Sequence, residues 1–143
     1  MTKLLLSVHV LAAILIVGPI AVAASLFPRF ARESTEGDKR PALLHRICRG
    51  YAVAGVIVPV FGLATGLQLG VLTDVWLLTS IVLTAIAAGI LVFLILPRQQ
   101  RLLTGPKDDR GAVRLAMFTG MFNLVWAVVV VLMIVRPGST TGV

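Results

Sequence analysis

The chain has 143 residues, of which 58% are hydrophobic and only 13% are charged, and its mean hydropathy is +1.00. Soluble domains carry about 25% charged residues, and a chain of this length has too little interior to hide so much apolar surface. The composition excludes a water-soluble enzyme or nucleic-acid-binding protein. We therefore expect an integral membrane protein, and the net charge of +7 must reflect something other than nucleic acid.

Four segments without any Asp, Glu, Lys or Arg predict four membrane-spanning helices. They are residues 4–28, 50–73, 75–97 and 115–135. A helix needs about 20 residues to cross a hydrocarbon core of about 30 Å, and unbroken apolar runs favour helices over the alternating strands of a membrane barrel. The prediction is an all-α chain, one membrane domain over residues 1–143, folded as a four-helix bundle in up-down-up-down order.

Prolines, glycines and charges predict where these helices begin and end. Pro41 suits the first turn of the second helix, and Gly105-Pro106 suits a stop followed by a new start. We expect helices at about 4–28, 42–72, 75–104 and 107–136, cytoplasmic loops at 29–41 and around 105, and an outer turn at 72–75.

The cations predict the orientation of the bundle. Eleven of the 13 Lys and Arg residues lie in residues 29–49 and 98–114, and the 72–75 turn holds none. The positive-inside rule makes the side with the cations cytoplasmic, which places both termini outside a bacterial inner (cell) membrane. The cations that flank the helices are expected to meet anionic lipid headgroups; they are Arg29, Arg32, Arg46, Arg49, Arg98 and Arg101.

Small residues predict the packing surfaces, because helices in lipid associate through close backbone approach and interhelical hydrogen bonds. The second helix carries a glycine stripe, and the fourth carries a small-residue face with one amide. The predicted packing residues are Gly55, Gly62, Gly66, Gly70, Gly120 and Asn123. A ligand or lipid groove along the glycine stripe and a homo-oligomer contact are the open alternatives.

His9 is the only ionisable residue well inside a charge-free segment. Such groups are costly in hydrocarbon, so each is a candidate for function. His9 shares a face with small residues, so we expect a hydrogen bond inside the bundle; haem or metal ligation and proton transfer are the alternatives. His45 belongs near the opposite membrane surface, at the interface beside Arg46 and Arg49, and cannot share one iron with His9.

Three segments resemble a known family. They are the run from Leu4 to Ala13 around His9, the run Leu44-His45-Arg46-Ile47, and the run from Asn123 to Gly138. They are similar to the predicted integral membrane proteins of domain-of-unknown-function family 2269, common in actinobacteria. The histidine-bearing first helix is also similar to that of copper-resistance D-like proteins and of HemJ-type protoporphyrinogen oxidases. The HemJ-type resemblance implies a lysine in the third helix, and this chain has no lysine between residues 40 and 106.

The sequence predicts a small membrane protein without its own catalysis. It contains no Cys-x-x-Cys-His, no HExxH and no glycine-rich phosphate loop. We expect an accessory or lipid-interacting subunit that contacts membrane lipids and further membrane subunits or copies of itself, with no metal, cofactor or nucleic acid. The alternatives are a haem-, porphyrin- or copper-linked redox protein that uses His9, with haem b as its cofactor, and a small oligomeric transporter.

Overall fold

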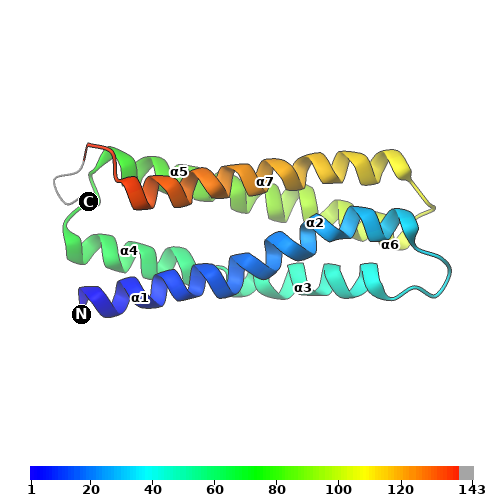
Figure 1. Ribbon diagram of the computed structural model, residues 1–143, viewed down its shortest axis with the longest axis horizontal. Coiled ribbons are helices and arrows are strands. Elements are labelled where there is room, and N and C mark those ends of the chain that lie inside the picture. The colour runs from blue at the N-terminus through cyan, green and yellow to red at the C-terminus, as the bar shows by residue number, and fades with distance from the viewer. Residues whose placement is uncertain (139–143) are drawn as a thin grey trace.

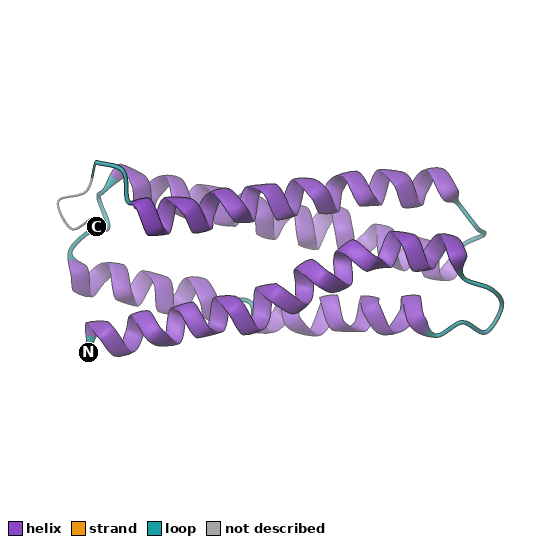
Figure 2. Cartoon of the chain, viewed as in Figure 1, coloured by secondary structure: helices purple, strands orange, loops and turns teal. Residues whose placement is uncertain are grey.

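The computed structural model describes residues 1–138, and within them it contains helices and no strand. The helical segments are α1 (Thr2–Ala12), η1 (Ala13–Val17), α2 (Gly18–Glu33), α3 (Arg40–Ala54), α4 (Ile57–Leu69), α5 (Val75–Gly89), η2 (Ile90–Ile95), α6 (Leu96–Thr104) and α7 (Asp109–Val135), where η1 and η2 are π-helical. They join into four long helices with short connections (Figure 2).

The four long helices are Thr2–Glu33, Arg40–Leu69, Val75–Thr104 and Asp109–Val135, each long and apolar enough to cross a membrane. The prediction of an all-helical chain with four such helices is confirmed. The first helix differs from its expected end, since it continues past Pro28 to Glu33. A proline inside a helix removes one backbone donor, and packed neighbours often compensate for this loss; Pro28 is buried among them.

Prolines explain the irregular turns. Each π-helical segment ends two residues before a proline: η1 before Pro19 and η2 before Pro97. Proline has no backbone N–H and so cannot donate the regular α-helical hydrogen bond. Pro59 likewise cannot bond to the carbonyl of Gly55. The N–H of Val58 donates to that carbonyl instead, at 3.1 Å, and the second long helix is divided there into α3 and α4. We expected one uninterrupted helix over residues 42–72.

The two ends of the bundle carry different connections (Figure 1). One, which we name the loop end, carries the connections at residues 34–39 and 105–108; the other, the turn end, carries the connection at residues 70–74. Thr2 donates to Gln68 Oε1 at 3.2 Å, and the Arg136 guanidinium lies 5.5 Å from the centre of the Trp76 ring. The start of α1 and the end of α7 therefore both lie at the turn end, away from the cationic loop end.

The core is unevenly distributed. Its main part lies where α2 packs against α3 and α7, and Phe27, Ile95 and Leu115 are fully buried there. A smaller cluster of Val71, Trp76 and Leu77 lies at the turn end. In the half of the bundle towards the turn end, α1 packs on α4 and α5 on α7, and no residue of α1 is buried.

Candidate functional site

His9 bonds to the backbone of a neighbouring helix. Its Nδ1 lies 2.8 Å from the carbonyl oxygen of Val58. A carbonyl can only accept, so Nδ1 carries a proton and donates this bond. The His9 side chain is half-buried where α1 packs on α4. Its bond to Val58 is the interhelical hydrogen bond that the small-residue face of the first helix led us to expect.

The glycine stripe of the second helix makes contacts of different kinds. A Cβ at Gly62 would lie 2.8 Å from His9 Cε1, and one at Gly66 would lie 3.0 Å from Leu77 Cδ2. Gly70 ends α4 in the left-handed conformation, with φ of 69°. Gly55 lies at the break between α3 and α4. A Cβ at Gly55 would lie 3.8 Å from Ile16 Cγ2, the nearest side-chain atom of another helix. The closest contacts of the stripe are therefore at Gly62 and Gly66.

The two predicted packing residues of the fourth helix, Gly120 and Asn123, differ in their surroundings. Asn123 Nδ2 donates to Ser25 Oγ at 3.0 Å and so joins α7 to α2. Gly120 is exposed, and no atom lies within 4 Å of the place a Cβ would take. The expectation that Gly120 packs inside the bundle is therefore not met within one chain. Leu115 and Phe122 are buried in the core instead.

A buried polar network joins α3 to α6 near the loop end. His45 Nδ1 lies 2.8 Å from Gln99 Oε1, and Gln99 Nε2 donates to Cys48 Sγ at 3.6 Å. Gln99 and Cys48 are fully buried and His45 is 7% exposed, so His45 packs against α6, a contact that the sequence did not lead us to expect. The sequence held one signal, since His45 and Cys48 are three residues apart and therefore share one face of the helix.

Some cations of the loop end have partners. Arg29 pairs with Glu33 at 3.0 Å, and the Arg98 guanidinium lies 4.4 Å from the centre of the Phe118 ring. Arg40 donates to Asp38 at 2.8 Å, and this hydrogen bond holds the pKa of the Asp38 carboxyl below its ordinary value.

Other cations of the loop end have no such partner. Within residues 1–138, neither Arg46 nor Arg49 takes part in an ion pair or a cation–π contact. Both are exposed, as are Arg32 and Arg101. Arg46 and Arg49 differ from the last two because they border hollows in the surface.

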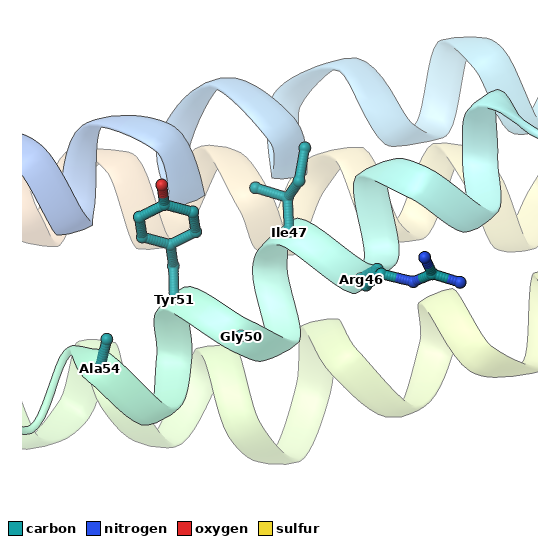
Figure 3. Close-up of a pocket in the computed structure, with 5 residues that line it drawn as sticks. All are labelled: Arg46, Ile47, Gly50, Tyr51 and Ala54. Atoms are coloured by element: carbon teal, nitrogen blue, oxygen red, sulfur yellow. The ribbon is translucent and has the colours of Figure 1, made fainter.

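Two adjoining hollows lie on the outer surface of α3, and both are lined by Arg46 and Gly50. One, of about 330 Å³, also has Ile47, Tyr51 and Ala54 in its wall (Figure 3). The other, of about 420 Å³, extends past Arg49 to Val53 and to Leu103 of α6, and His45 lies in its wall. Gly50 is exposed and no atom lies within 4 Å of the place of a Cβ. We name the two hollows together the Gly50 groove.

The histidines do not form a shared metal site. His9 bonds at Val58 and His45 bonds at Gln99. The 13 residues from His45 to Val58 correspond to about 20 Å of helix, so one iron cannot bind both. No group of three or more His, Cys, Asp or Glu side chains suited to a metal ion occurs in the part of the chain that the structure describes.

Comparisons with protein families, with curated proteins and with solved structures find no match to this chain. The resemblance to domain-of-unknown-function family 2269 therefore stays a prediction.

Proposed function

We propose that the chain is a bacterial inner-membrane protein whose four long helices cross the bilayer in up-down-up-down order, with the loop end in the cytoplasm and both termini outside. The outward surface of the helices supports this. Large apolar side chains stand exposed on all four long helices, among them Leu15 at 64%, Val53 at 77%, Phe93 at 76% and Leu124 at 68%. An apolar surface that covers whole helices is unfavourable in water, whereas it is well solvated by lipid tails.

The proposed role is that of an accessory subunit without its own catalysis, which acts by binding anionic membrane lipids. One observation carries this proposal. The cations gather at the loop end, and Arg46 and Arg49 have no acidic partner within residues 1–138. Basic residues at the cytoplasmic surface attract anionic headgroups, with about 1 kcal/mol for each cation near the surface.

Lipid-dependent stability tests the proposed role. The purified protein is reconstituted into nanodiscs of phosphatidylcholine alone and of phosphatidylcholine with phosphatidylglycerol, and thermal unfolding is followed by circular dichroism. We expect a higher Tm with phosphatidylglycerol, and a smaller difference at high salt, since salt screens exposed charges. Equal Tm values in the two lipid mixtures would contradict the role.

A second candidate role is redox chemistry with haem b held by His9. It is favoured by the His9–Val58 bond, because metal-binding histidines commonly donate their other ring N–H to a carbonyl and bind through the free nitrogen. His9 would hold the haem iron through Nε2, and His45 is too far away to bind the same iron. Haem would supply the electron transfer.

An optical spectrum of the purified protein, with and without added haem, tests this second role. The role requires a Soret band that His9→Asn abolishes and His45→Asn leaves intact. Addition of haem without a protein-bound Soret band excludes it and leaves the lipid proposal untouched.

A further inference from the structure

The Gly50 groove has its polar and apolar walls in a definite order along α3. Arg46 lies one turn before Gly50, towards the loop end, and Val53 and Ala54 lie one turn after it. In Figure 3 the Arg46 side chain extends away from Ala54, and Ile47 and Tyr51 rise from the helix on one side of Gly50. An amphiphile with an anionic head and a hydrocarbon tail has this same order.

The charged end of the groove is not neutralised by the protein. The described ion pairs belong to Arg29 and Arg40, and Arg98 stacks on Phe118. Arg46 and Arg49 therefore retain their charge and their donors for an outside partner. Guanidinium groups bind phosphate oxygens through short, charge-assisted hydrogen bonds.

His45 adds a rigid polar group to the same wall. It is nine-tenths buried, and its ring is fixed because Nδ1 donates to Gln99, which is held in turn by Cys48. Nε2 is then the nitrogen left for a further hydrogen bond, and a headgroup hydroxyl can donate to it. A polar group that is locked before binding loses little entropy when a ligand arrives.

The apolar end of the groove depends on the missing side chain at position 50. A larger residue there would fill the space between Arg46 and Val53, because side chains four and three residues away share that face. Open space at this glycine lets a hydrocarbon chain lie against the helix backbone.

We propose that the Gly50 groove binds one anionic phospholipid, with its phosphate between Arg46 and Arg49, a hydroxyl of its headgroup beside His45, and one acyl chain along Gly50, Val53 and Ala54. The inference rests on the proposed function and sharpens it, because it replaces a diffuse layer of headgroups around the loop end with a single site. Basic pockets on the cytoplasmic side of membrane helices are suited to such headgroups.

Native mass spectrometry of the detergent-purified protein tests the site by titration with phosphatidylglycerol. We expect one tightly retained lipid, and an affinity about tenfold lower for the double variant Arg46→Gln/Arg49→Gln, since charge-assisted hydrogen bonds to the phosphate are lost. The matched control is Arg110→Gln/Arg114→Gln, which removes the same charge from exposed positions of the loop end. This control should stay within about twofold of the wild type.

Glycine variants test the acyl-chain part without a change of charge. Gly50→Leu should lower the affinity about tenfold because it fills the groove, a loss comparable to one or two buried methylene groups. Gly120→Leu, at an equally open glycine on α7, should leave lipid binding unchanged. Both leucines favour a helix over glycine, so neither variant should impair folding.

The outcomes separate the site from the general role. Equal losses in the two arginine pairs, or no loss in Gly50→Leu, would overturn the single site while leaving the role in binding anionic lipid in place. Equal retention of phosphatidylglycerol and phosphatidylcholine by the wild type would overturn both. Displacement of the lipid by inorganic phosphate at similar concentrations would show a site for a free anion and would also overturn the phospholipid assignment.

Discussion

The imidazole of His9 lies over Gly62, so closely that a Cβ at residue 62 would be 2.8 Å from Cε1 and 3.1 Å from Nδ1. The same ring bonds to the carbonyl of Val58, four residues before Gly62. Helical side chains lean back over the preceding turn, so any side chain at 62 would cover that carbonyl. The glycine therefore makes the interhelical bond possible, and the two residues are expected to depend on each other.

A double-mutant cycle measures this dependence. Gly62→Ala should be neutral or destabilising in the wild type, because the gain of about 0.5–1 kcal/mol from replacing a helical glycine is offset by displacement of His9. In the His9→Ala background the same change should stabilise the protein by about that gain. Thermal or denaturant unfolding in one detergent gives both values, and an equal effect in the two backgrounds would show that the residues are independent.

Substitutions of His9 itself separate its hydrogen bond from other roles. His9→Asn places an amide N–H near the position of Nδ1 and should keep most of the stability. His9→Leu should cost on the order of 1 kcal/mol in the free energy of unfolding, because the bond to Val58 is lost. A leucine variant as stable as the wild type would leave His9 without a structural role.

The buried network around Gln99 predicts a larger effect. Gln99→Leu leaves the Nδ1–H of His45 without its acceptor in a buried site, which should cost about 1–3 kcal/mol. Gln100→Leu, at the adjacent exposed position, is the matched control and should change stability by less than about 0.5 kcal/mol. Similar unfolding curves for the two variants would argue against the network.

The long helices could be predicted from the sequence because their signal is local. A run without charges, such as residues 115–135, is sufficient to indicate a helix of membrane-spanning length. The partner of His9 was not identified, but the small residues around it and the glycines of the second helix pointed to a close helix contact.

The inward faces could not be predicted equally well. The fourth helix carries apolar residues on every side, and its small-residue face includes Gly120, which is exposed, whereas Phe122 on another face is buried. In lipid, hydrophobicity does not decide the matter either. The His45–Gln99 bond joins residues 54 positions apart and depends on how α3 meets α6, which no short motif encodes. The Gly50 groove depends on the same packing.

The asymmetry of charge predicts the orientation of the proposed membrane protein. In a Cys48→Ser background, a cysteine at Thr35, an exposed loop-end position, should resist membrane-impermeant thiol reagents in intact cells. A cysteine at Thr73, which is exposed in the turn-end connection, should react. Labelling of both after the cells are lysed is the control, and the reverse pattern in intact cells would invert the orientation.

Gly66 tests the packing of the second helix at the turn end. A Cβ there would lie 3.0 Å from Leu77 Cδ2 and 3.1 Å from Leu72 Cδ2, and Leu77 is buried in the cluster with Val71 and Trp76. Leucine ends can shift slightly, so Gly66→Ala should be tolerated, whereas Gly66→Leu should cost about 1–3 kcal/mol by overpacking.

Gly120→Leu is the matched control for Gly66→Leu, because it adds the same side chain to a helical glycine with open space around it. It should leave the Tm unchanged or raise it, since leucine favours the helix. Unfolding of the two variants in the same detergent makes the comparison direct. A Gly66→Leu variant as stable as Gly120→Leu would show that α4 does not pack against Leu72 and Leu77, and that this part of the glycine stripe faces lipid.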